Sequence, residues 1–93
     1  MSGAEEYELI VTPPAARALA EGLGEAVATA VIEFLTTALV GEPRRVGKAL
    51  QRELSGIYSA RRGTYRVLYR INEERREVIV LRVEHRRDVY RSR

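Results

Sequence analysis

The sequence predicts an α+β fold in which a helix hairpin packs on one face of a mainly antiparallel, twisted sheet. Three observations lead to that prediction. Patterns typical of one strand and two helices occupy the first half of the chain, three strand patterns joined by short turns occupy the second half, and the hydrophobic fraction of 45% is enough for a core. The element order is therefore βααβββ in two layers, and 93 residues make a single domain over 1–93.

The first half combines apolar patterns with residues that start and stop helices. Residues 7–11 predict a short strand, and Thr12 followed by Pro13 is typical of a helix start, because a proline in the first turn loses no hydrogen bond. A first helix follows over 15–21 and ends near a glycine. A second helix is predicted over 25–40, because apolar residues recur there at spacings of three and four. They are Val27, Val31, Phe34, Leu35 and Ala38.

The second half changes to a period of two, which is typical of strands. A basic connector over 44–53 leads to strands over 56–62, 64–71 and 77–84, with a break at Gly63. We expect the helices to cover the side of the sheet that carries Tyr69, Ile71, Leu81 and Val83. The opposite side then presents Arg66, Arg70 and Arg82. On this interpretation the tyrosines at 58, 65 and 69 belong to the sheet and the core.

The charge is divided unevenly between the two halves of the chain. Residues 1–43 carry one base and seven acids, a net charge of −6, whereas residues 44–93 carry fifteen bases and six acids, a net charge of +9. The net charge of +9 in the second half indicates a polyanionic partner. Nucleic acid is favoured, and an acidic partner protein is left open.

Composition excludes several kinds of site. Without cysteine the chain forms no disulfide, no thiolate zinc site and no cysteine nucleophile. His85 is the only histidine, which excludes a multi-histidine metal site within one chain, and we expect neither a metal nor a small-molecule cofactor. No apolar run reaches the roughly 18 residues of a membrane helix. The acidic N-terminus lacks the pattern of a signal peptide, so we expect a cytoplasmic protein without membrane contact.

Three segments resemble a known family. They are Leu54–Gly63 with its Ser-Ala-Arg-Arg-Gly run, Tyr65–Ile71 with Tyr-Arg-x-x-Tyr, and Val83–Tyr90 with His-Arg-x-x-x-Tyr. Together with the βααβββ order, they are similar to the RelE branch of the RelE/ParE toxin superfamily, and above all to its actinobacterial RelE-type toxins. The resemblance implies a RelE-like fold and a toxin of a type II toxin–antitoxin system, a ribosome-dependent endoribonuclease that cuts mRNA in the A site and inhibits translation. It also implies two partners: the ribosome with its mRNA, and an acidic, RelB-like antitoxin.

The chemistry that this resemblance implies needs no metal. The ribose 2′-OH attacks the adjacent phosphate, which yields a 2′,3′-cyclic phosphate and a free 5′-OH. Arg66 matches the family's arginine that stabilises the transition state, and Arg86 matches the arginine near the leaving group. Tyr90 matches the tyrosine that stacks on a nucleobase, although it follows Arg86 at a shorter spacing than in the founding member.

The proton transfers have no clear family match, because Ile57 and Ser59 stand about where the founding member has two lysines. Lys48 is the only lysine, and we expect the charges of Arg44, Arg45 and Arg52 to favour its neutral form; the alternative is a solvated loop lysine.

Two other side chains are candidates for proton transfer. One is His85, because histidine is the side chain that changes charge near neutral pH; its alternative role is a structural histidine bonded to Glu84 or Asp88. Glu84 is the remaining candidate base, with a cross-strand ion pair to Arg66 or Arg70 as its alternative.

A run of arginines is predicted to contact the phosphates of mRNA and ribosomal RNA, with an ordinary charged rim as the alternative. These are Arg44, Arg45, Arg52, Arg61 and Arg62. For the whole chain, two other functions stay open beside the endoribonuclease. One is a ParE-like toxin that inhibits DNA gyrase without enzymatic activity, and the other is a nucleic-acid-binding module without turnover.

Overall fold

The computed structural model describes residues 6–85. Its elements in chain order are β1 (Glu8–Val11), α1 (Pro13–Arg17), the π-helical turn η2 (Ala18–Gly22), α2 (Glu25–Phe34), the π-helical turn η3 (Leu35–Leu39), β2 (Lys48–Ala49), the 3₁₀ turn η4 (Arg52–Leu54), β3 (Tyr58–Arg62), β4 (Tyr65–Asn72) and β5 (Glu77–His85).

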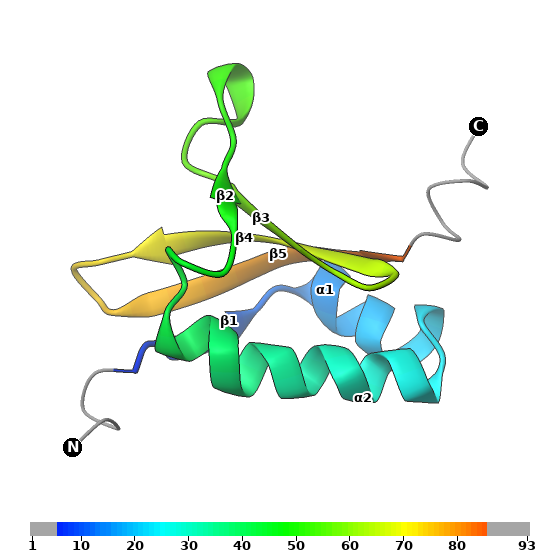
Figure 1. Cartoon of the computed structure of the whole chain (residues 1–93). Coiled ribbons are helices and arrows are strands. Elements are labelled where there is room, and N and C mark those ends of the chain that lie inside the picture. Colours follow the sequence, from blue (N-terminus) through cyan, green and yellow to red (C-terminus); the bar gives the residue numbers. More distant parts are fainter. Residues whose placement is uncertain (1–5, 86–93) are drawn as a thin grey trace.

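The strands form one sheet in the order β1-β5-β4-β3-β2 (Figure 1). β1 lies parallel to β5, and the other neighbouring pairs are antiparallel. The helices cover one side of this sheet, the helix-covered face (Figure 1). Val67 and Tyr69 of β4 are buried in the core between this face and the helices. The other side, the open face, carries their strand neighbours Arg66 and Leu68. The predicted two-layer α+β fold is confirmed, with β2 as a small additional strand.

Proline and glycine set the limits of the helix hairpin. Thr12 is extended, Pro13 opens α1, and Gly24 turns the chain into α2 with a φ of 84°. Thr12 precedes the helix as predicted, but its side chain does not cap it. Instead Thr12 Oγ1 donates to the carbonyl oxygens of Val80 and Leu81, at 2.9 and 3.0 Å. The hairpin is thereby tied to β5, and the second predicted helix is confirmed as α2 with η3.

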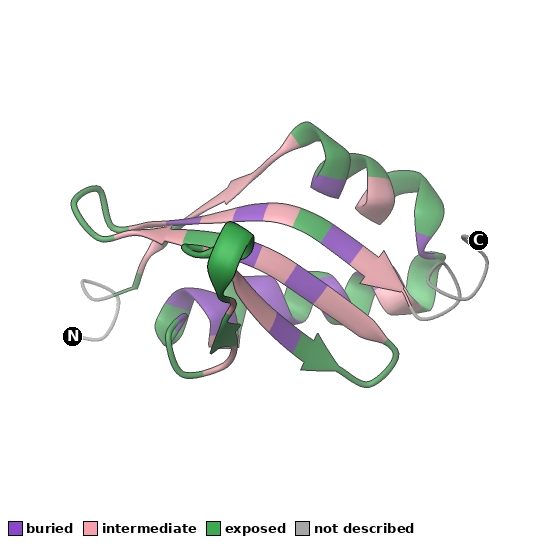
Figure 2. Cartoon of the chain, turned by 90° about the horizontal axis from the view of Figure 1, so that it is seen from above, coloured by how far each residue is buried: buried purple, intermediate pink, exposed green. Residues whose placement is uncertain are grey.

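Apolar side chains of both layers form the core, and along β4 and β5 buried residues alternate with intermediate or exposed ones (Figure 2). The helical layer contributes Ala15, Leu23, Ala28, Val31, Phe34, Leu35 and Leu39. The sheet contributes Ala60, Val67, Tyr69, Val78, Val80 and Val83.

Tyr69 is the largest fully buried side chain. Its hydroxyl donates to the carbonyl oxygen of Pro43 at 2.6 Å, and the ring of Tyr58 stacks on it at 5.5 Å between centroids. Burial raises the pKa of Tyr69 to about 12. A Cβ at Gly47 would lie 2.3 Å from the Tyr69 hydroxyl oxygen, so only glycine fits there. The placement of the tyrosines at 58, 65 and 69 in the sheet and core is confirmed.

Because of a β-bulge, the predicted face is wrong for Leu81 and for the residues of β5 that precede it, 78–80. The β4–β5 register pairs Leu68 with Arg82 but Tyr69 with Val80, so Leu81 has no partner in β4. An extra residue inverts the alternation of side chains. Val78 and Val80 therefore enter the core, which excludes Leu81, whereas Val83 beyond the bulge is buried as predicted.

The predicted basic connector over 44–53 contains the strand β2 and the first part of a projecting hairpin. Lys48 and Ala49 pair with Ser59 and Tyr58, and the amide of Leu50 donates to the carbonyl oxygen of Ile57 at 2.8 Å. The hairpin, residues 50–57, rises from the open face and ends in η4 (Figure 1). The hairpin therefore borders the open face at the β2 edge of the sheet.

Between residues 6 and 85, no helix is long and apolar enough to cross a membrane. The same part of the chain contains no group of three or more His, Asp or Glu side chains that could hold a metal ion.

Candidate nucleic-acid interface

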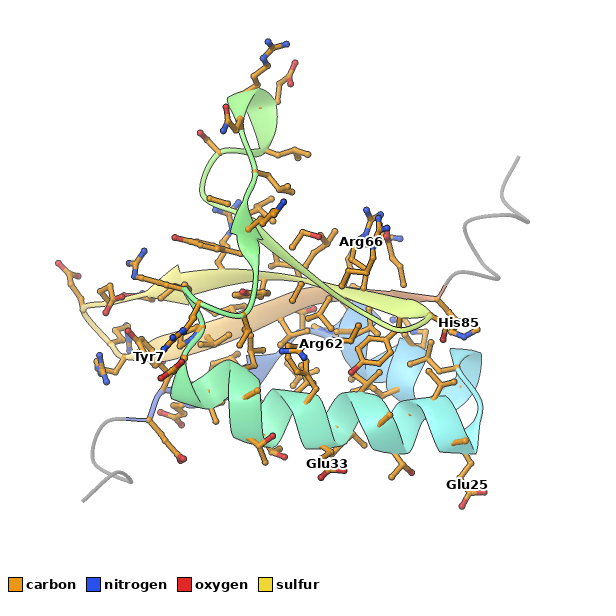
Figure 3. The ribbon with its side chains drawn as sticks, in the orientation of Figure 1. Tyr7, Glu25, Glu33, Arg62, Arg66 and His85 are labelled. Carbon is orange, nitrogen blue, oxygen red and sulfur yellow. The ribbon has the colours of Figure 1, made fainter. Side chains whose placement is uncertain are left out.

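The open face of the sheet collects basic side chains from four strands. The register sets Arg61 beside Arg66 and Lys48 beside Ser59, so they share this face. The cations of the face are Lys48, Arg61, Arg66, Arg70 and Arg82. Arg66 points away from the helices (Figure 3), and the placement of Arg66, Arg70 and Arg82 opposite the helices is confirmed.

Arg66 is held by a carboxylate of the neighbouring strand. Its Nε and Nη2 atoms both donate to Glu84 Oε1, at 3.1 and 2.5 Å. The second carboxylate oxygen, Oε2, lies 3.7 Å from Arg82 Nε. The side chains of Arg66 and Glu84 are 38% and 22% exposed. The ion pair between Arg66 and Glu84 is thus confirmed, and Arg82 is an additional partner that sequence reasoning missed, although Arg82 and Glu84 stand two residues apart on one strand.

Arg61 and Arg62 point to opposite sides of the sheet, because neighbouring residues of a strand alternate. The Arg62 guanidinium carbon lies 4.7 Å from the ring centroid of Phe34, which in turn meets Tyr65 edge-on at 6.4 Å. Figure 3 shows Arg62 between the sheet and α2. Burial raises the pKa of Tyr65, and the charge of Arg62 opposes that rise. Arg61 and Arg62, both predicted to contact RNA phosphates, therefore lie on opposite faces of the sheet, and only Arg61 shares a face with Arg66.

His85 lies at the end of β5, away from Arg66. It is paired with Tyr65, two residues beyond Val83, so the register assigns it to the helix-covered face. Its Nε2 atom lies 3.1 Å from Thr64 Oγ1. In Figure 3, Arg66 and His85 lie on different sides of the sheet. His85, a predicted candidate for proton transfer, therefore does not share a face with Arg66.

Lys48 shares the open face with Arg66 but not its strand. It is exposed in the edge strand β2, and β3 lies between it and β4. At the usual strand spacing, the two backbones are about 10 Å apart. The charge of Arg44 is expected from the sequence to favour the neutral form of Lys48. Arg44 instead contacts Tyr58 on the helix-covered side.

Arg44 belongs to a network at one end of the sheet. Its Nε atom donates to Glu73 Oε2 at 2.9 Å, its Nη1 atom donates to the Tyr58 hydroxyl at 2.8 Å, and the Tyr7 hydroxyl donates to Glu73 at 2.9 Å. Hydrogen bonds from Tyr7 and Arg44 lower the pKa of Glu73. The guanidinium of Arg76 lies 4.0 Å over the Tyr7 ring. These contacts join segments far apart in the chain, so Arg44 has a structural role.

The remaining predicted contacts are scattered. Arg45 pairs with Glu42 at 3.2 Å, and Arg52 lies in η4 of the projecting hairpin with a φ of 61°. Arg86 and Tyr90 lie outside the described residues. Of the five predicted RNA contacts, Arg61 is the one that lies beside Arg66.

The sequence matches the model of a known family over residues 9–90, that of the ParE toxin of the type II toxin–antitoxin system parDE. Among curated proteins, the chain is 40% identical over 91 residues to toxin RelE of Mycobacterium tuberculosis, covering 98% of this chain and 93% of that one. It is 58% identical over 65 residues to toxin RelG of the same organism, covering 70% of this chain and 75% of that one.

A solved structure agrees with the family match and with the two curated relatives. The crystal structure of the toxin–antitoxin complex RelBE2 from M. tuberculosis contains a chain that is 51% identical, with a TM-score of 0.83, over 87% of this chain and 99% of that one. The chain therefore belongs to the RelE/ParE superfamily of type II toxin–antitoxin toxins, and it has the RelE-like fold. Within that superfamily it is a toxin of the RelE type, since it matches toxin RelE and a chain of the RelBE2 complex over nearly their whole length.

Proposed function

We propose that this toxin is a ribosome-dependent endoribonuclease that cuts mRNA in the A site by attack of a ribose 2′-OH on the adjacent phosphate. The observation that carries the proposal is Arg66, held by Glu84 on an open, basic sheet face beside Arg61. The face is broad and cationic, as an RNA phosphate backbone requires.

Arg66 suits the stabilisation of the phosphorane. Charge builds up on the non-bridging phosphate oxygens as the 2′ oxygen attacks, and a preorganised guanidinium lowers that barrier. Arg61 and Arg82 add positive charge on the same face and favour binding of the backbone on either side. No step of this reaction needs a metal.

The proton transfers fall to groups that share the face with Arg66. Among the titratable strand residues of that face, Lys48 and Glu84 are the two sequence-predicted candidates, and His85 points to the other side. Lys48 is the better proton carrier, because Glu84 is engaged by two arginines. Arg86 near the leaving oxygen and Tyr90 stacked on a base complete the proposed set.

The partners follow from charge and from the relatives. The related RelBE2 structure is a toxin–antitoxin complex. We infer that a small acidic antitoxin holds this chain inactive, since the basic half is complementary to such a segment. Its target, the translating ribosome, places its action in the cytoplasm.

Programmed ribosomes with a defined A-site codon test the proposal. We expect cleavage within that codon, a 2′,3′-cyclic phosphate and a 5′-OH as ends, and no cleavage of the same mRNA without ribosomes. A single 2′-deoxynucleotide at the cut site should abolish cleavage and leave ribosome binding unchanged. Intact mRNA together with normal growth on expression would contradict the proposal, and gyrase-linked DNA breaks would favour the ParE-like mode.

A further inference from the structure

The pair of Arg66 and Glu84 has an uneven geometry. Two N–H donors of Arg66, one on Nε and one on Nη2, reach the same carboxylate oxygen, Oε1. The other oxygen, Oε2, faces Arg82 at 3.7 Å. The carboxylate is thus held from two sides, and Glu84 is the less exposed partner, at 22% against 38% for Arg66.

This contact fixes the plane of the Arg66 guanidinium. Two N–H groups on one edge of the fork share one acceptor, so rotation about the terminal bonds of the side chain is restricted. Glu84 lies directly across the ladder from Arg66, and the regular β-pairing defines where its carboxylate sits.

The contact leaves the other donors of Arg66 available. A guanidinium has five N–H donors, and Glu84 engages two of them. The three others, two on Nη1 and one on Nη2, have no hydrogen-bond partner among residues 6–85. They form an outer edge that matches two oxygens of a phosphate.

We propose that Glu84 is a positioning residue that aims the outer edge of Arg66 at the scissile phosphate before the RNA arrives. This inference rests on the proposed endoribonuclease function. Glu84 does not itself take the proton of the 2′-OH, because its carboxylate oxygens face Arg66 and Arg82. Preorganisation of this kind acts on the barrier, since the guanidinium does not have to be reoriented as charge develops.

The simpler interpretation is an ion pair that only supports the sheet. Such pairs contribute little to stability when partly exposed. It predicts that losing Glu84 lowers the melting temperature slightly and leaves the cleavage rate of the saturated complex unchanged. Glu77 offers a matched control, because it lies on the same strand, is 21% exposed and pairs with Arg75 at 3.7 Å.

A double-mutant cycle separates these interpretations. We expect Glu84→Ala to lower the single-turnover rate at saturating ribosomes by about 10- to 100-fold, the range for a misplaced catalytic group. Glu84→Gln should recover part of the rate, because its amide oxygen still accepts both N–H groups. In an Arg66→Ala background, Glu84→Ala should cause no further loss, and Glu77→Ala should match the parent.

Three results would overturn the inference. One is a parental rate for Glu84→Ala. Another is a loss in the Arg66→Ala background as large as in the parent, which would mean that Glu84 acts independently. The third is loss of the acidic limb of the pH–rate profile in Glu84→Gln, the mark of a general base. Absence of cleavage by the parent itself would instead refute the proposed function, and the inference with it.

Discussion

The two faces of the sheet are built from the same strands and have opposite character. In β4, Val67 and Tyr69 are fully buried beneath the helices, whereas Arg66 and Arg70 point to the open face. No charged side chain is buried within residues 6–85. Because successive side chains of a strand point to opposite faces, one residue packs in the core and its neighbour is available on the open face. Changes on one face should therefore alter stability, and changes on the other should alter activity.

The outer side of the helical layer adds a third surface with the opposite charge. Glu25 and Glu33 are exposed on α2 and point away from the sheet (Figure 3). The charge imbalance between the two halves of the sequence becomes an imbalance between two sides of the molecule. Only the basic side suits a polyanion.

The largest effect is expected on the open face. Arg66→Ala should lower the single-turnover cleavage rate by about 100- to 1000-fold, because a donor aimed at transition-state charge is lost. Ribosome binding, assayed separately, should stay nearly parental. Arg70→Ala is the control on the same strand and face, and we expect its rate at saturation to stay parental. If Arg66→Ala cuts as fast as the parent once bound, the open face is not the site of the reaction.

Gly47→Ala tests whether a change on the helix-covered side of the sheet lowers stability. The new methyl group would lie 2.3 Å from the Tyr69 hydroxyl oxygen and 2.9 Å from the carbonyl oxygen of Ser59. We expect a loss of about 1–3 kcal/mol in the free energy of unfolding, the usual result of overpacking. Gly41→Ala, where a Cβ meets nothing within 4 Å, should cost much less in the same urea titration. Equal stabilities of the two variants would show that the loop after η3 moves to accept the methyl group.

Tyr69→Phe tests the buried hydroxyl on the same side. It leaves the carbonyl oxygen of Pro43 without its donor, which should cost about 1–3 kcal/mol of stability near neutral pH. The cleavage rate of the folded protein at saturation should not change. A large loss of rate without a loss of stability would contradict the division of roles between the faces.

The same tyrosine predicts a pH dependence of stability. Burial raises its pKa to about 12, from 10.0 for an unburied tyrosine, so the folded state retains a proton that the unfolded state releases. The stabilisation is present in full below pH 10 and is lost as the pH rises through 12. We expect the parent to lose about 2 kcal/mol more than Tyr69→Phe over that interval in denaturant titrations. Parallel pH curves for the two proteins would contradict this.

Local patterns were enough to predict the layers of the fold. Proline and glycine mark the helix ends, and strict alternation assigns the faces of β4. The pattern of β5 could not reveal the bulge, because Val78 to Leu81 are all apolar and either alternation looks the same. β2 escaped prediction since it is two residues long and exists only through its pairing with β3.

The site was predictable only in part. Arg66 and its partner Glu84 followed from alternation in two neighbouring strands. The roles of Arg44 and Arg62 did not, because Glu73 lies 29 residues from Arg44 and Phe34 lies 28 residues before Arg62. Contacts between such distant segments depend on the packing of the layers, which no local pattern records.

Arg61 and Arg62 provide the finest test, since they are chain neighbours on opposite faces. Arg61→Ala should weaken ribosome binding and reduce the slope of log K against log salt by about 0.7–0.9, the release expected for one phosphate contact. Arg62→Ala should leave that slope unchanged. It should instead lower the free energy of unfolding by about 0.5–1 kcal/mol, because the guanidinium no longer covers the Phe34 ring. Salt titrations of binding and urea titrations of stability on both variants give four numbers. The two faces predict that Arg61→Ala changes the salt slope and that Arg62→Ala changes the free energy of unfolding. Equal slopes for the two variants would mean that RNA reaches around the edge of β3, and that the boundary between the faces lies elsewhere.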